Sequence, residues 1–86
     1  MEEEVLSEKN TILNLLRSYG YRITKQREIL IDILLKGNCT SGKEIYQEAR
    51  LKYPGIGFAT IYRFLGTMEQ LGVISRSNMF RVISFR

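Results

Sequence analysis

One stretch of this sequence combines side chains suited to binding an anion. On a helical projection of residues 58–71, Arg63 falls on a face of small and polar side chains that carries no acid. A guanidinium there can bond O6 and N7 of guanine together in a major groove, or grip a phosphate. Tyr62 flanks the same face, where its ring could contact a thymine methyl group and its hydroxyl a phosphate. The alternatives are a solvated arginine and a tyrosine at the edge of the core.

Small residues on this face have a complementary use. A helix that enters a groove needs short side chains where its backbone approaches the bases, and Ala59 and Gly66 supply them. Thr60, near the start of the helix, could donate to a phosphate that the free backbone N–H groups also attract. Taken singly, each of the three is more simply an ordinary residue of a helix surface.

A second group of cations, Arg22, Lys25 and Arg27, lies before and within the first turn of a helix predicted over residues 25–36. Cations are unfavourable at this positive end of the helix dipole, and a bound phosphate would compensate them. The group is therefore a second candidate contact with a nucleic-acid backbone. A solvated basic face is the alternative.

The sequence lacks the residues on which many enzymes and metal sites depend. It has no histidine and one cysteine, Cys39, so the commonest general base and the commonest transition-metal ligand are missing. The carboxylates are scattered over expected helix surfaces and form no catalytic group. We therefore expect no enzymatic activity, no cofactor and no metal, and we interpret Cys39 as a small residue before a helix.

Length and charge favour a small domain with an anionic partner. The 86 residues are enough for one domain, with 44% hydrophobic residues to form its core. Residues 1–9 hold four glutamates and one lysine, a net charge of −3, and predict an acidic, flexible leader. The remaining residues hold twelve cations and five acids, a net charge of +7.

With one cysteine, no signal peptide and no apolar segment of membrane-spanning length, a cytoplasmic location away from membranes is expected.

Apolar spacing and capping residues predict the helices that position these side chains. The first helix begins at Ser7 or Asn10 and stops at Gly20. The second runs from an N-cap at Thr24 to a stop at Gly37. The side chains expected to face the core are Ile12, Leu13, Leu15, Leu16 and Tyr19 in the first helix and Ile29, Leu30, Ile33 and Leu34 in the second.

Two more helices follow. Ser41 and Glu44 form a capping box, in which each side chain satisfies a free backbone N–H of the other residue, and the third helix runs from there to about Lys52. The fourth helix covers residues 58–71. The side chains expected to face the core are Ile45, Tyr46 and Ala49 in the third helix and Phe58, Ile61, Leu65, Met68 and, at the edge, Leu71 in the fourth.

Residues 73–85 contain two β-branched and aromatic runs, 73–76 and 80–85, which predict a two-stranded antiparallel hairpin. Arg76 and Arg81 bracket its tip, where a wing could lie along a nucleic-acid backbone. Four helices followed by a hairpin are the order of a winged helix-turn-helix, a mostly α fold with a small β wing.

Four motifs in this order are distinctive: GYRITKQR at 20–27, SGKEIY at 41–46, GIGFATIYRFL at 55–65 and LGVI at 71–74. Together they resemble the N-terminal DNA-binding domain of the ferric uptake regulator (Fur) family. The resemblance runs from about residue 12 to 85 without a large gap. Its most specific part is the segment Gly-Phe-Ala-Thr-Ile-Tyr-Arg, residues 57–63.

The resemblance implies that Tyr62 and Arg63 contact DNA and that the basic residue at position 22 can reach the minor groove. Members of that family normally continue into an α/β dimerisation domain with His, Cys and acidic metal ligands, whereas this sequence ends at Arg86. We therefore expect a single winged-helix domain over residues 1–86, without the dimerisation domain and without metal sensing. The position of Cys39 often carries a metal-binding histidine in the family, which leaves this thiol as the one remnant of a ligand set.

The prediction is sequence-specific binding to double-stranded DNA by a transcription regulator, with helix 58–71 in the major groove and hairpin 73–85 as the wing. The free protein is expected to be monomeric, with pairing of two chains only on DNA. The alternative is a winged helix that binds another regulator without contacting DNA, with the acidic leader as the contact. The candidate DNA-binding residues are Arg22, Lys25, Arg27, Ala59, Thr60, Tyr62, Arg63, Arg76 and Arg81.

Overall fold

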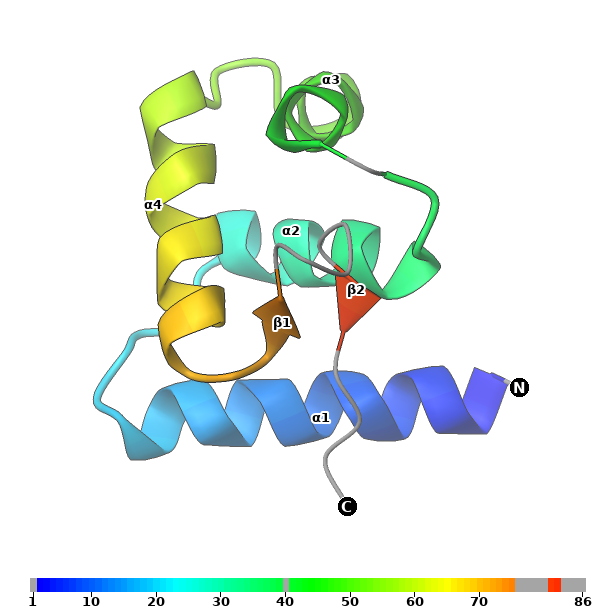
Figure 1. Ribbon diagram of the computed structural model, residues 1–86, viewed down its shortest axis with the longest axis vertical. Helices are drawn as coiled ribbons and strands as arrows, with labels where there is room; N and C mark the ends of the chain where they lie inside the picture. Colours follow the sequence, from blue (N-terminus) through cyan, green and yellow to red (C-terminus); the bar gives the residue numbers. More distant parts are fainter. Residues whose placement is uncertain (1, 40, 76–80, 83–86) are drawn as a thin grey trace.

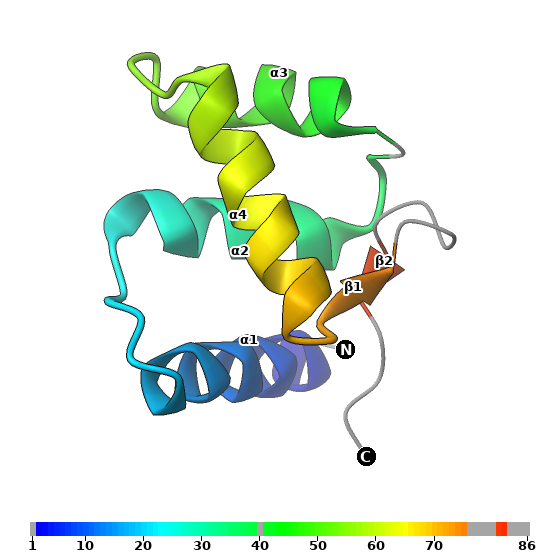
Figure 2. The ribbon, with the colours of Figure 1, turned by 60° about the vertical axis from the view of Figure 1, so that its left-hand side comes forward.

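In the computed structural model, which describes residues 2–39, 41–75 and 81–82, four helices precede two short strands; for residues 2–7 and 81–82 the backbone alone is described. Helices α1, α2 and α3 lie one above another, and α4 crosses over them (Figure 2). The strands follow α4 and lie beside α2 (Figure 1). None of the helices in these ranges is long and apolar enough to span a membrane. The elements are α1 (Glu2–Ser18), α2 (Lys25–Lys36), α3 (Gly42–Lys52), α4 (Phe58–Gln70), β1 (Ile74–Ser75) and β2 (Arg81–Val82).

Helix α1 begins at Glu2, so the start predicted at Ser7 or Asn10 is wrong. Residues 2–9, interpreted above as an acidic leader, belong to the helix. Glutamate is a good helix former and is favoured near a helix N-terminus, where the dipole is positive. The middle of α1 is tied to α2, because Lys9 Nζ lies 3.1 Å from an Asp32 carboxylate oxygen.

The apolar stripe predicted on α1 is buried except at its last member. Tyr19 follows the end of the helix at Ser18 and is 64% exposed, so its assignment to the core is wrong. Gly20 comes next with a φ of +85°, a left-handed conformation that suits glycine and turns the chain away from the helix. The confirmed members of the stripe are Ile12, Leu13 and Leu16, which are buried, and Leu15, which packs against them.

Capping residues set both ends of α2 and the start of α3 where the sequence predicts. Thr24 Oγ1 accepts a hydrogen bond from Arg27 N at 3.2 Å, and Gly37 closes α2 in the left-handed conformation at φ +71°. Ser41 Oγ accepts from Glu44 N at 3.2 Å and starts α3. These bonds satisfy N–H groups that have no partner within the helix, so residues close in sequence are sufficient to set these helix ends.

Helix α4 buries a different aromatic residue from the one that its projection predicts. Phe58, expected in the core, is 41% exposed. It lies in the first turn, where its ring packs edge-on against Tyr46 of α3 with the centroids 4.9 Å apart. Phe64, whose angle on the projection falls between those of Met68 and Leu71, is buried instead. The predicted members that are confirmed as buried are Ile61, Leu65 and Met68.

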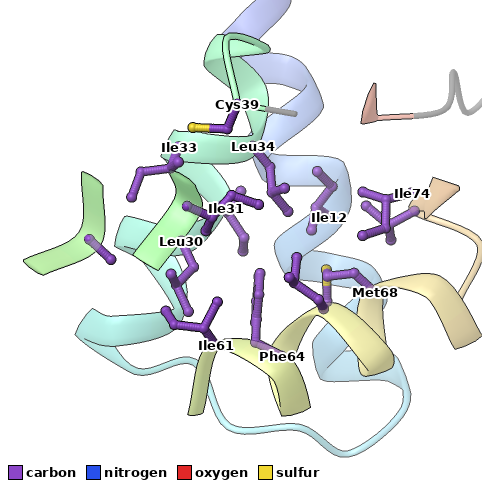
Figure 3. Packing of buried hydrophobic residues seen from close by; sticks show 14 of the residues in the cluster. Ile12, Leu30, Ile31, Ile33, Leu34, Cys39, Ile61, Phe64, Met68 and Ile74 are labelled. Atoms are coloured by element: carbon purple, nitrogen blue, oxygen red, sulfur yellow. The ribbon is translucent and has the colours of Figure 1, made fainter. Parts of the chain in front are cut away.

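One hydrophobic core joins all four helices and β1. Figure 3 shows its side chains converging, among them Ile12 of α1, Ile31 of α2, Met68 of α4 and Ile74 of β1. Burying an apolar side chain of this size contributes roughly 1.5 to 3 kcal/mol. The core therefore holds α2 and α4, which carry the candidate binding residues, in a defined arrangement.

The strands β1 and β2 pair antiparallel, with Ile74 opposite Val82 and Ser75 opposite Arg81. Each has two residues, fewer than the runs 73–76 and 80–85 predict. Residues 76–80, which would form the tip of the predicted hairpin, lie outside the described residues. The complete hairpin therefore stays a prediction.

Candidate nucleic-acid interface

A hollow of about 560 Å³ lies between the start of α2 and the side of α4 that carries Thr60, Phe64 and Thr67. Arginines line it from both sides, with Arg22 and Arg27 at the start of α2 and Arg63 on α4. No carboxylate is among its lining residues, so three positive charges from two separate elements attract an anion to the same place. We call this site the arginine hollow. Its other lining residues are Leu16, Thr24, Gln26, Leu30, Thr60, Phe64, Thr67 and Met68.

On the α2 side, the three predicted cations differ in their surroundings. Arg22 is exposed in the segment that precedes α2. Lys25, the first residue of α2, is also exposed but does not line the arginine hollow. Arg27 is half-buried, donates a hydrogen bond to the carbonyl of Arg22 and lies over the Tyr21 ring, 5.6 Å from its centroid. Arg27 is thus bound to its own chain on two sides.

On the α4 side, the predicted outward face is confirmed as accessible. Ala59 and Arg63 are exposed one turn apart. Thr67 lines the arginine hollow, and its hydroxyl donates to the Arg63 carbonyl at 3.1 Å. A Cβ atom added to Gly66 would meet no atom within 4 Å beyond its own helix and chain neighbours, so open space lies over the backbone there. This face of α4 can approach a surface closely, with Arg63 projecting from it.

Tyr62 lies beside this face, against α3. The residue is 43% exposed, and its ring packs on that of Phe58 with the centroids 4.8 Å apart. Its hydroxyl end lies over Gly42, the first residue of α3. Tyr62 is thus partly packed, as the core-edge alternative predicts, and partly exposed, while its contact with DNA stays a prediction.

The acidic side chains of α2 are directed to α1 instead of the arginine hollow. Glu28 and Asp32 are one turn apart, and Lys9 Nζ lies 3.9 Å from Glu28 Oε1 and 3.1 Å from Asp32 Oδ1. Neither carboxylate lines the arginine hollow. This separation leaves the positive charge of the hollow without an acid among its lining residues.

The structure brings some of the predicted DNA-binding residues together and leaves others apart. Arg76 lies outside the described residues, and only the backbone of Arg81, in β2, is described. The predicted residues that line the arginine hollow are Arg22, Arg27, Thr60 and Arg63. Those that are exposed outside it are Lys25, Ala59 and Tyr62.

Sequence reasoning missed three polar members of the arginine hollow, Thr24, Gln26 and Thr67. The sequence marks Thr24 only as an N-cap, and it gives Thr67 no binding role. No spacing within either helix marks them, because the hollow is formed between two helices that are distant in sequence. The one feature of the sequence that could have indicated an anion-binding site there is the absence of acids from the outer face of residues 58–71.

Cys39 lies just before α3 and is buried. Burial raises the pKa of its thiol, and the negative charges of Glu48 and Glu44 raise it further. Among the described residues, no three His, Cys, Asp or Glu side chains gather where they could hold a metal ion. The surroundings of Cys39 therefore do not fit a metal site built from the described residues.

Comparison with known proteins gives two consistent results. The family model described as "Ferric uptake regulator family" matches residues 18–82. A ferric uptake regulation protein of Staphylococcus epidermidis (strain ATCC 12228 / FDA PCI 1200) is 32% identical over 78 residues, which cover 90% of this chain and 56% of the relative. The protein of the same name from Staphylococcus aureus (strain Mu50 / ATCC 700699) is also 32% identical over 78 residues, 90% of this chain and 57% of the relative. No solved structure matches the chain.

The chain spans a little more than half the length of these curated relatives. The match to the family model runs from the end of α1 to β2. It includes both sides of the arginine hollow and the outer face of α4. The resemblance inferred from the motifs is thus confirmed, and the chain belongs to the ferric uptake regulator family.

Proposed function

We propose that this chain is a winged-helix domain of a transcription regulator and binds double-stranded DNA in a sequence-specific manner. The observation that carries the proposal is the arginine hollow, which Arg22, Arg27 and Arg63 line with no acid among the lining residues. Major-groove readers commonly insert one helix and hold the backbone with neighbouring cations. Here α4 is the inserted helix and the start of α2 holds the backbone.

Each candidate residue has a defined part in this proposal. Arg63 projects into the major groove, where it bonds a guanine edge or a phosphate. Ala59 and Gly66 let the α4 backbone approach the bases, and Thr60 donates to a phosphate near the start of the helix. Tyr62 adds a contact from the side of α3. The remaining predicted contacts are to the DNA backbone, from Arg22, Lys25 and Arg27 beside α2 and from Arg76 and Arg81 of the wing.

The proposal involves no enzymatic step. It includes a chain that is monomeric when free and that pairs with a second copy only on DNA. A single reader domain of this kind buries about 600 to 1,000 Å² on DNA, so its affinity depends strongly on the phosphate contacts and therefore on salt.

The experiment begins with selection of bound duplexes from a random-sequence pool, followed by fluorescence anisotropy on the selected duplex and on a scrambled one. Affinity should fall steeply as salt is raised from about 50 to 200 mM. Arg63→Ala should weaken binding to the selected duplex by about 1 to 3 kcal/mol and relax the preference at one base position.

Arg50→Ala is the matched control, because Arg50 is exposed on α3 and lies outside the arginine hollow. If Arg63→Ala weakens binding to the selected and the scrambled duplex equally, Arg63 contacts a phosphate and not a base. Absence of binding to any duplex would overturn the proposal and favour a domain that binds another regulator.

A further inference from the structure

The three arginines of the arginine hollow are not equivalent. Arg22 and Arg63 are exposed, whereas Arg27 is half-buried and engaged with its own chain. Its guanidinium lies 5.6 Å from the centroid of the Tyr21 ring and donates to the carbonyl of Arg22. A guanidinium over an aromatic face and bonded to a carbonyl is restricted in where it can point.

Arg27 stands on a rigid part of the chain. Its backbone N–H donates to the Thr24 hydroxyl at 3.2 Å, and Glu28 N donates to the Thr24 carbonyl at 3.0 Å, which closes the first turn of α2. The backbone of Arg27 is therefore fixed by the first turn of α2, and its side chain reaches back to Tyr21 and Arg22.

The segment that precedes α2 has few backbone anchors of its own. Residues 21–24 form neither helix nor strand, and they follow Gly20 at φ +85°. Tyr21 N donates to the Leu16 carbonyl at 2.9 Å, which fixes one end to α1. Between that bond and the cap at Thr24, the Arg27 guanidinium contacts both the Tyr21 ring and the Arg22 carbonyl. These two contacts hold the backbone from which the Arg22 side chain extends.

We propose that Arg27 is a positioning residue, which acts on DNA through Arg22 and makes no phosphate contact of its own. The proposal rests on the DNA binding proposed above and refines the assignment of Arg27 as a direct contact. In this arrangement Arg22 is the phosphate-binding residue at the start of α2. Arg27 and Tyr21 hold it toward the arginine hollow.

The test is a double-mutant cycle of Arg22→Gln and Arg27→Gln, measured as duplex affinity over a range of salt concentrations. Each phosphate contact contributes about 0.9 to the slope of log affinity against log salt. Arg22→Gln should lower the slope by about one contact and weaken binding roughly tenfold or more. Arg27→Gln should act in the same direction, and in the Arg22→Gln background it should have no further effect.

Tyrosine variants separate positioning from a general loss of folding. Tyr21→Leu removes the ring under the guanidinium and should reproduce the effect of Arg27→Gln, whereas Tyr21→Phe keeps the ring and should bind like the unchanged chain. In the free protein, amide hydrogen exchange of residues 21–24 should accelerate in Arg27→Gln while exchange in the core of α4 stays slow. That readout shows the positioning directly and does not depend on DNA.

Three results would overturn the inference. If the double variant loses about two contacts from the salt slope, Arg27 binds a phosphate itself, and DNA binding as the proposed function still stands. If exchange of residues 21–24 is unchanged in Arg27→Gln, Arg27 does not hold this segment. If the unsubstituted chain binds no duplex at all, the proposed function and this inference are overturned together. That outcome is recognised without any variant.

Discussion

Gly42 at the start of α3 lies directly beneath the hydroxyl end of Tyr62 in α4. A Cβ atom added to Gly42 would be 3.1 Å from both Cζ and the hydroxyl oxygen of Tyr62 and 3.3 Å from Cε1. Contacts this short are tighter than ordinary van der Waals contact, so the two residues are matched in size. The absence of a side chain at Gly42 thus sets where Tyr62 presents its hydroxyl.

The Gly42–Tyr62 contact predicts an interaction between two substitutions. Alanine is a better helix former than glycine. Where the new methyl group has room, Gly42→Ala should therefore raise the free energy of unfolding by up to about 1 kcal/mol. When Tyr62 is retained, its ring must move to make room for the new methyl group, and most of this gain in unfolding free energy should be lost. In the Tyr62→Ala background the gain should appear in urea unfolding. Simple additivity of the two substitutions would show that the contact has no energetic weight.

The open space over Gly66 predicts opposite effects on stability and binding. A methyl group there meets no atom within 4 Å beyond its own helix and chain neighbours, so Gly66→Ala should raise the free energy of unfolding by about 0.5 to 1 kcal/mol. If the α4 backbone approaches DNA at this point, the same substitution should weaken duplex binding. Urea unfolding and anisotropy on one protein preparation measure both. Unchanged affinity in the stabilised variant would place the DNA elsewhere along α4.

Burial of Cys39 predicts a specific dependence of stability on pH. The folded state raises the pKa of the thiol above its ordinary value of 9.0. The unfolded chain therefore loses this proton first. The contribution of the thiol to the free energy of unfolding is fully present below the unfolded pKa and is lost as the pH rises through the folded pKa.

Comparison with Cys39→Ala isolates this effect from the titration of lysine and tyrosine. The difference in unfolding free energy between the unchanged chain and Cys39→Ala should be constant near neutral pH and should shrink above about pH 9. Urea unfolding at a series of pH values gives the curve. A difference that grows with pH would mean that the folded state favours the thiolate.

The ion pair of Lys9 with Asp32 predicts a modest link between α1 and α2. Both side chains are partly exposed, so the coupling in a double-mutant cycle of Lys9→Met and Asp32→Asn should be about 0.2 to 1 kcal/mol and should decrease with added salt. Duplex affinity should not change in Lys9→Met, because this pair lies outside the arginine hollow. A coupling indistinguishable from zero at low salt would show that this ion pair does not stabilise the packing of α1 on α2.

The sequence by itself determined the features that depend on near neighbours along the chain. The limits of α2 and the start of α3 follow from Thr24, Gly37 and Ser41, whose caps and left-handed φ are local interactions. The outer face of α4, with Ala59 and Arg63, follows from the helical repeat. The motif at residues 57–63 was sufficient to indicate the family.

Only the tertiary structure decided the features that depend on what packs against each element. Phe58 is not in the core position that its spacing predicts, because the first turn of α4 meets Tyr46 of α3, and periodicity within one helix does not show that contact. The packing of α1 on α2 includes the pairing of Lys9 with Asp32, 23 residues away.

The arginine hollow belongs to this second class. Arg22 and Arg63 come from segments distant in sequence, and the core between α2 and α4 brings them to the same hollow. The engagement of Arg27 with Tyr21 and Arg22 depends on the path of the chain before α2. Sequence reasoning identified these cations by residue type and position, but their geometry follows from nonlocal packing, which a one-dimensional pattern does not encode.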